Sequence, residues 1–455
     1  MIIRNFYDDK LAQASYLIGC AASGEAIVID PLRDIGQYLD TALQQGLRIV
    51  AVAETHIHAD YLSGSRELAA ATGATMYLSD EGDVDWKYGF ANQANAVLLK
   101  NGDVIPVGNV SLQTRHTPGH TPEHLAFLLV DHPVSEIPHS VFSGDFIFVG
   151  DVGRPDLLER AANLAGTMEK GARALFRSIQ DIRDLPDSLL IWPGHGAGSA
   201  CGKSLGGSPV TSLGYERCTN WAFQISDEDK FVEEVLSGQP EPPTYFKHMK
   251  RLNKEGPAIL QSMPHPLQAF KVTGRLVDVR SGGEVRSGLA RGALAIPSGK
   301  GLTTWAGWLL DYSEPVTLVA SDQESANSAA RDFATIGLDV VENWIHPTDL
   351  GLELAPIISI DPPHILPSDF VLDVRSSNER AKQHISGSVG IPLGELRGRL
   401  GEVPQDRRII VHCSTGGRSP IAYSMLQNAG FTNLFEISGG IGAVQESCPA
   451  LIAKT

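Results

Sequence analysis

The chain has 455 residues, of which 42% are hydrophobic and 20% are charged, a composition typical of a globular protein of about three domains. The formal net charge of −16 argues against nucleic acid and anionic membranes as partners. The first residues lack the basic segment and the apolar segment of a signal peptide. No apolar run approaches the about 18 residues that a membrane span requires, so we expect a cytoplasmic protein without a membrane partner.

Short apolar segments and amphipathic patterns predict a layered α/β domain in the first half of the chain. The expected elements are strands at 16–18, 26–30 and 49–53 and helices over 34–45, 64–72 and 157–179. Residues 207–255 have mostly helical patterns with a Pro-rich break. Because this stretch is too short for a core of its own, we expect it to be an appendage of the first domain.

Metal-binding side chains gather on the loop that follows the strand at 49–53. His56, His58 and Asp60 lie close together there, and imidazole and carboxylate groups are ligands that suit zinc or iron. Three further candidates each follow a short apolar segment and a glycine, which lets the backbone bend and bring side chains together. They are His120, Asp145 and His195. Since the same strand-then-loop arrangement occurs four times, a metal site is favoured over a polar loop in which histidines cluster by chance.

The second half of the chain contains an internal repeat. Three segments recur: 276–280 at 371–375, 293–297 at 388–392, and 316–321 at 409–413. Two copies of one α/β unit are therefore predicted after the metal-binding domain. The expected domains are 1–261, 262–356 and 357–455.

A second reactive loop lies in the second copy, between an apolar strand and a helix predicted over 421–429. Backbone N–H groups around its glycines can form a nest that stabilises negative charge, which predicts a nucleophilic Cys413 rather than a buried, inert cysteine. Arg418 adds a fixed positive charge, and the stretch that starts at Ser321 in the first copy has no cysteine, glycine or arginine. We therefore expect the first copy to be inactive. The other residues of the reactive loop are Ser414, Thr415, Gly416, Gly417 and Ser419.

These motifs carry resemblances to two families. The four metal-binding segments resemble the metallo-β-lactamase superfamily, which implies a two-sheet αββα sandwich with its ligands along one edge. Residues 357–455, with the Cys413 loop and the Asp373-Val-Arg375 motif, resemble the rhodanese (sulfurtransferase) family. The whole chain is similar to the CstB-type family, in which a persulfide dioxygenase is fused to an inactive and an active rhodanese. The expected fold class is α/β, with the sandwich followed by two rhodanese-like α/β domains.

The resemblance to persulfide dioxygenases implies that His56, His120 and Asp145 bind one Fe(II) per chain, with open positions for O2 and a persulfide sulfur. Tyr61 stands where the superfamily often has a histidine, which disfavours a second metal ion. Cys201 would be either a sulfur relay near the metal or a structural cysteine. The residues expected to orient the ligands or to contact substrate are His58, Asp60, Tyr61, Arg154, His195 and Cys201.

The same resemblance implies a bifunctional enzyme of sulfide detoxification. The iron site would oxidise a low-molecular-weight thiol persulfide with O2 to sulfite, and Cys413 would pass sulfane sulfur to sulfite to give thiosulfate. A homo-oligomer is expected. The alternatives are a glyoxalase-II-like thioester hydrolase with two zinc ions and a non-enzymatic persulfide carrier or sensor.

Overall fold

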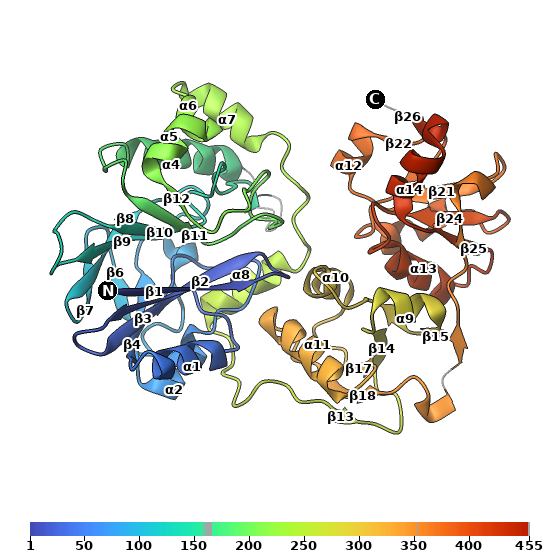
Figure 1. Ribbon diagram of the computed structural model, residues 1–455, viewed down its shortest axis with the longest axis horizontal. Coiled ribbons are helices and arrows are strands. Elements are labelled where there is room, and N and C mark those ends of the chain that lie inside the picture. Colours follow the sequence, from blue (N-terminus) through green and yellow to red (C-terminus); the bar gives the residue numbers. More distant parts are fainter. Residues whose placement is uncertain (158, 160–165, 352, 454–455) are drawn as a thin grey trace. The chain divides into compact units, whose positions relative to one another are not determined.

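The computed structural model describes residues 1–157, 159, 166–351 and 353–453. The chain forms two compact units (Figure 1). The first unit contains Met1–Met263 with Thr335–Gly337, and the second contains Pro264–Ala334 with Leu338–Thr455. The three domains expected from the sequence, with boundaries at 262 and 357, stay a prediction.

Two six-stranded sheets form the centre of the first unit. The first sheet has the order β1 (Ile2–Asp8), β2 (Gln13–Cys20), β3 (Glu25–Ile29), β4 (Arg48–Ala53), β5 (Thr75–Ser79) and β6 (Val97–Leu99). Strands β1 to β3 pair antiparallel and β3 to β6 pair parallel. The second sheet has the order β12 (Thr211–Ser212), β11 (Leu190–Pro193), β10 (Ser140–Gly144), β9 (Leu125–Asp131), β8 (Val110–His116) and β7 (Val104–Val107). In this second sheet only β10 and β11 pair parallel.

Each sheet is apolar on both faces, so each strand contributes to two cores. In β2, Tyr16 and Ile18 point into the core between the two sheets, whereas Leu17 packs on the opposite face. Helices α1 (Gly36–Gln44) and α2 (Ser65–Thr72) cover that opposite face of the first sheet. The helices α4 (Thr167–Asp181), α5 (Leu213–Thr219) and α7 (Glu228–Leu236) cover the outer face of the second sheet (Figure 1). The layers are therefore α, β, β and α, as the fold-class prediction states.

The expected helices differ from the observed ones mainly at their ends. The helix expected over 34–45 begins at Gly36, and the helix expected over 64–72 is α2, which stops where Gly73 takes a φ of 74°. Residues 158 and 160–165 of the expected long helix lie outside the described residues, and α4 begins at Thr167. The stretch 207–255 contains α5, α6 (Trp221–Gln224), α7 and α8 (Phe246–Glu255), and it belongs to the first unit.

The second unit contains two parallel five-stranded sheets with the same topology. The first has the order β13 (Leu267–Gln268), β18 (Val341–Ile345), β17 (Val316–Val319), β14 (Arg275–Asp278) and β16 (Leu294–Ala295). The second has the order β20 (Ser359–Ile360), β25 (Leu434–Ile437), β24 (Ile409–His412), β21 (Phe370–Asp373) and β23 (Val389–Gly390). We call the two halves the first copy and the second copy, as in the predicted repeat. Their helices are α9 (Gly282–Ser287), α10 (Leu302–Leu309) and α11 (Gln323–Thr335), then α12 (Ser377–Lys382), α13 (Ser419–Asn428) and α14 (Gly440–Ser447).

The two copies also share local contacts. After β14, Arg280 forms two bonds with Asp278, and after β21, Arg375 does the same with Asp373. The next helix starts in both copies with a capping box, made by Ser281 and Glu284 in α9 and by Ser376 and Glu379 in α12.

Strand register corrects one detail of the predicted repeat. Asp278 lies opposite Val319, and Asp373 lies opposite His412. The residue that follows Val319 is Ala320, so Ala320 and not Ser321 occupies the position of Cys413. Within the described part of the chain, no helix has the length and apolar character needed to cross a bilayer.

Candidate active sites

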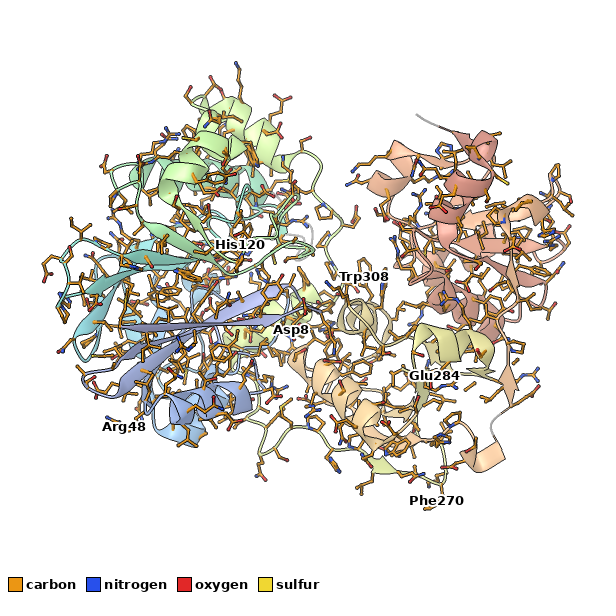
Figure 2. All side chains as sticks on the ribbon, viewed as in Figure 1. Asp8, Arg48, His120, Phe270, Glu284 and Trp308 are labelled. Atoms are coloured by element: carbon orange, nitrogen blue, oxygen red, sulfur yellow. The ribbon has the colours of Figure 1, made fainter. Side chains whose placement is uncertain are left out.

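The predicted metal ligands meet at one edge of the sandwich. His56 follows β4, His120 follows β8 and Asp145 follows β10, and all three side chains are buried. Their potential ligand atoms lie within 4.8 Å of one another. The Nε2 atoms of His56 and His120 are 3.9 Å and 3.4 Å from Asp145 Oδ2 (His120 is labelled in Figure 2). The structure therefore brings together the three residues that the sequence analysis selected.

Hydrogen bonds determine which nitrogen of each histidine faces this cluster. His120 Nδ1 donates to the main-chain oxygen of Arg154 at 3.0 Å. Thr55 Oγ1 donates to Asp30 Oδ2 at 2.8 Å and lies 2.9 Å from His56 Nδ1, so this nitrogen must be the donor. The Nε2 lone pairs of both histidines are thus directed at the cluster, which is the arrangement that metal-binding histidines have in proteins.

The electrostatics of the cluster fit a bound cation. Burial lowers the pKa of His56 and of His120, so both imidazoles are neutral and can act as ligands. Although burial opposes it, the neighbouring histidines hold the pKa of Asp145 well below its usual range. His56 Nε2 and Asp145 Oδ2 have no hydrogen-bond partner among the described residues. Buried polar atoms seldom lack a partner, and a divalent metal ion would satisfy both atoms.

His195, Asp60 and Cys201 lie beside the metal cluster. His195 Nδ1 is 2.7 Å from Asp145 Oδ1, and its Nε2 is 2.8 Å from Asp60 Oδ2. Against the effect of burial, the carboxylates of Asp145 and Asp60 raise the pKa of His195 to about 10. Burial and the same two carboxylates raise the pKa of Cys201, which disfavours its thiolate form. A protonated, buried thiol is a poor nucleophile, which favours the structural interpretation of Cys201 over that of a sulfur relay.

His58 turns away from the metal cluster. Its Nε2 atom is 3.2 Å from Asp30 Oδ1 and 3.0 Å from Glu54 Oε2. Burial disfavours the charged form, yet these two carboxylates raise the pKa of His58 well above its usual value, so His58 is a buried cation. Asp30 also accepts the hydroxyl of Thr55, and in this way His58 acts on His56 indirectly.

Tyr61 and Arg154 are fully buried but do not present their polar ends to the cluster. The hydroxyl of Tyr61 bonds with Gln13 and with the main-chain oxygen of Asp30, both at 3.2 Å. The guanidinium of Arg154 forms two bonds with Asp156, at 2.7 and 2.8 Å. Arg154 contacts a candidate ligand only through its main-chain oxygen, and its guanidinium is bonded to Asp156 and to the main-chain oxygen of Ala200.

Several supporting residues were not selected from the sequence. His124 Nε2 accepts the main-chain N–H of Asp145, and its ring stacks on that of His56 at 5.0 Å. Asn253 in α8 donates to the main-chain oxygens of His58 and Tyr61, at 2.8 and 2.7 Å, and accepts the N–H of Ser63 at 3.0 Å. Asn253 therefore holds the metal loop by its backbone. The signal in the sequence for Asn253 is its helical spacing from Phe246 and Met249, which places an amide on the apolar side of α8.

The glycines beside the ligands are required by close approach. Gly144 has a φ of 50°, and a Cβ there would lie 2.6 Å from Thr55 Oγ1. A Cβ on Gly194 would lie 2.7 Å from Asp145 Oδ1. Any larger residue would push the loops apart, which accounts for the glycines before Asp145 and His195.

The predicted sulfur loop connects β24 to α13 in the second copy. Cys413 is buried, and its Sγ accepts the main-chain N–H of Gly416 at 3.1 Å and lies 3.6 Å from Ser419 Oγ. Gly416 has a φ of 99°, which turns this N–H toward the sulfur. The loop therefore has the nest-like geometry that the sequence predicts, with the sulfur on its inner side.

Arg418 is held at the rim of the loop. Its guanidinium forms two bonds of 2.6 Å with Glu379 and donates to Ser414 Oγ at 3.0 Å. Despite burial, this pairing holds the pKa of Glu379 far below its usual range and keeps both groups charged. Arg418 thus braces the loop from outside, and its partner Glu379 is a residue that the sequence analysis did not select.

A cavity of about 600 Å³ lies over the sulfur loop. Gly417 and Arg418 line it from the second copy, and Arg286, Lys300 and Trp305 line it from the first copy. Two of its cationic side chains are paired with carboxylates, Arg286 with Glu436 and Arg418 with Glu379. The volume is within the range of pockets that hold small organic ligands.

The corresponding loop of the first copy keeps one contact of the active loop. Ser321 Oγ donates to Glu284 at 2.7 Å, just as Ser414 Oγ donates to Glu379 at 2.7 Å. Glu284 is labelled in Figure 2. Because Ala320 occupies the position of the reactive cysteine, this loop has no sulfur to transfer.

Replacing Ser321 by alanine should leave both O2 uptake and sulfur transfer unchanged in the folded protein. The matched control is Ser414→Ala, which removes a bond to Arg418 and should slow sulfur transfer several-fold, about the cost of one hydrogen bond. Both rates are measured on the full chain. Slower sulfur transfer in Ser321→Ala would mean that the first loop takes part in the reaction.

Known proteins match the chain in both halves. Residues 8–195 match the metallo-beta-lactamase superfamily, and residues 360–447 match the rhodanese-like domain. A solved structure from Staphylococcus aureus, described as a metallo-beta-lactamase, is 43% identical and covers 76% of this chain and 99% of its own, with a TM-score of 0.72.

The relatives that match the first half include a persulfide dioxygenase and a hydroxyacylglutathione hydrolase. The mitochondrial persulfide dioxygenase ETHE1 of Bos taurus is 28% identical over 50% of this chain and 78% of its own length. A hydroxyacylglutathione hydrolase of Polaromonas is 36% identical over 40% of this chain and 61% of its own length. With the αββα sandwich and the parallel sheet of the second copy, these matches confirm the predicted fold class. The chain belongs to the metallo-beta-lactamase superfamily, is homologous to persulfide dioxygenases in its first half and carries a C-terminal rhodanese-like domain.

Proposed function

We propose that the chain is a bifunctional enzyme that oxidises a low-molecular-weight thiol persulfide with O2 and transfers sulfane sulfur through Cys413. The observation that carries this proposal is the cluster of His56, His120 and Asp145, a two-histidine, one-carboxylate set with two orphaned ligand atoms. Such a set is typical of non-haem Fe(II) oxygenases, because three protein ligands leave positions for O2 and substrate. The similarity to persulfide dioxygenases supports the same substrate class.

The overall oxidation conserves atoms and electrons. A persulfide RSSH reacts with O2 and water to give RSH, sulfite and two protons. The sulfane sulfur loses four electrons and O2 gains four. The proposed Fe(II), one per chain, supplies the redox chemistry when bound.

The residues of the chain hold this site in place. The Asp30–Thr55 pair and the carbonyl of Arg154 fix the orientation of the two imidazoles. His195 is hydrogen-bonded to the other oxygen of Asp145, which leaves Oδ2 directed at the cluster. The side chains of His56, His120 and Asp145 are buried, which strengthens the electrostatic interactions among them.

Sulfur transfer uses the second copy. The Cys413 thiolate attacks the sulfane sulfur of a second persulfide molecule, the S–S bond of that molecule breaks, and the thiol RSH leaves with a proton. The terminal sulfur of the resulting Cys413 persulfide then bonds to sulfite, which releases thiosulfate and restores the thiolate. The N–H of Gly416 stabilises negative charge on the sulfur in both steps.

A dinuclear zinc hydrolase is the rival function, because hydroxyacylglutathione hydrolases are also relatives. Two side chains weigh against it. Tyr61 takes the place of a second-metal histidine, and His58 is engaged by Asp30 and Glu54. A non-enzymatic persulfide carrier would have no use for the metal cluster.

Metal analysis of protein purified without oxygen tests the proposal. We expect about one iron per chain, since three ligands with open positions match Fe(II) oxygenase chemistry. Glutathione persulfide should then drive O2 uptake, whereas the thioester S-lactoylglutathione should not be hydrolysed. Two tightly bound zinc ions together with thioester hydrolysis would establish the rival function instead.

A further inference from the structure

An arginine of the inactive first copy reaches the sulfur loop of the second copy. Arg286 lies in α9, and its Nη2 donates to the main-chain oxygen of Gly416. The same guanidinium forms two bonds with Glu436 in β25, at 2.9 Å from Nε and at 2.7 Å from Nη2. The loop that carries Cys413 is therefore bonded directly to the other copy.

Glu436 connects this arginine to the reactive sulfur. The carboxylate is fully buried and also accepts the hydroxyl of Ser419 at 2.6 Å. Ser419 Oγ in turn lies 3.6 Å from Cys413 Sγ. A continuous row of polar contacts thus runs from Arg286 through Glu436 and Ser419 to the sulfur.

The positive charge of Arg286 offsets the negative charge of Glu436 near the Cys413 sulfur. A buried carboxylate without a counter-ion would oppose negative charge on the nearby sulfur, and that charge is required in both steps of sulfur transfer. The two bonds from Arg286 neutralise Glu436, and bonding to Glu436 raises the pKa of Arg286 above its already high value. The arginine is therefore always charged.

The backbone of the loop is shaped to accept the arginine. A Cβ on Gly416 would lie 2.9 Å from Arg286 Nη2, in addition to the strain imposed by its φ of 99°. A second hydrogen bond between the two copies lies near this point. Ser424 in α13 accepts the main-chain N–H of Ala295 in the edge strand β16, at 3.0 Å.

We propose that Arg286 is a positioning residue for sulfur transfer, which fixes the Gly416 peptide and balances Glu436 behind the Cys413 sulfur. This inference rests on the proposed sulfur-transfer function of the second copy. The first copy, although it has no reactive cysteine, is then a working part of the transfer site.

Steady-state sulfur transfer from thiosulfate to cyanide by the full chain tests this role. Arg286→Ala should lower kcat about tenfold to a hundredfold, as expected when a loop shifts by a fraction of an ångström, with KM changed much less. The matched control is Arg291→Ala, because Arg291 lies in the same copy but pairs with an exposed glutamate, Glu353. Arg291→Ala should transfer sulfur normally, and O2 uptake should be unchanged in both variants.

Two further measurements separate positioning from simple support of the fold. Adding guanidinium ion to Arg286→Ala should restore part of kcat, and Glu436→Gln in the same background should restore part of it by removing the unbalanced charge. Restored kcat in either case supports the proposal. A folded Arg286→Ala with normal kcat overturns it, and so does a loss that neither measure reverses. If the unaltered protein shows no transfer that depends on Cys413, the proposed function itself fails.

Discussion

Replacing Cys413 by serine should uncouple the two reactions, so that the variant continues to consume O2 but releases sulfite in place of thiosulfate. Serine has the size of cysteine, but its hydroxyl is far less acidic and cannot carry a sulfane sulfur. Cys413 accepts a bond from Gly416 in the second unit, whereas the candidate metal ligands belong to the first unit with its own core. Sulfite and thiosulfate are assayed together, with glutathione persulfide and O2 as substrates.

Cys448→Ser is the matched control for this experiment, because Cys448 is a free, half-buried cysteine of the same copy outside the loop. It should produce thiosulfate at the normal rate. Undiminished thiosulfate from Cys413→Ser would locate sulfur transfer elsewhere, with Cys201 the next residue to replace. Loss of O2 uptake in Cys413→Ser would mean that the two sites depend on each other.

Removing any one of the three candidate metal ligands should abolish O2 uptake. In His56→Ala, His120→Ala and Asp145→Ala the rate should fall by more than about a hundredfold, since loss of an outer hydrogen-bonding partner alone costs up to that much. Each ligand lies on a loop beyond the end of a strand, so the sandwich should still fold. The measurements are O2 uptake, iron content and thermal unfolding.

Two controls keep this prediction specific, one measured in the three ligand variants and one in a separate surface variant. Transfer of sulfur from thiosulfate to cyanide should persist, because that reaction needs only the second unit. His132→Ala should behave like the unaltered protein, since His132 is an exposed histidine that pairs with Glu136 on the surface. O2 uptake that survives in all three ligand variants would show that the oxygenase site lies elsewhere.

The sequence was sufficient to select residues whose chemistry and local position are both distinctive. His56, His120 and Asp145 follow short apolar strands, and strand ends on one edge of a sheet must lie near one another. Cys413 could be selected because it also follows a strand and has glycines after it, whose backbone N–H groups can stabilise a negative charge. The structure brings each of these groups into the predicted surroundings, while their catalytic roles stay predictions.

Contacts between distant segments could not be predicted in this way. His58 and His56 are alike in sequence, yet Asp30 and Glu54 draw His58 into a separate ion cluster. The register of β17 shows that Ala320 occupies the position equivalent to Cys413, whereas the sequence alignment of the repeat was one residue out and placed Ser321 there. Arg286 has no local motif, and its role depends on how the two copies pack. In each case the deciding partner is set by tertiary structure and not by neighbouring residues.

The contact of Asn253 with the metal loop has a consequence for biosynthesis. The main-chain oxygen of Tyr61 lies 192 residues earlier in the chain than the amide that binds it. At about 5–20 residues per second, a ribosome needs roughly 10–40 s to make that stretch. During this interval the strands that flank the loop are already available, but the loop lacks three of its backbone bonds. The metal centre is therefore completed late in synthesis, after α8 has emerged, and a nascent chain that stalls before α8 would contain the ligands without a fixed loop to present them.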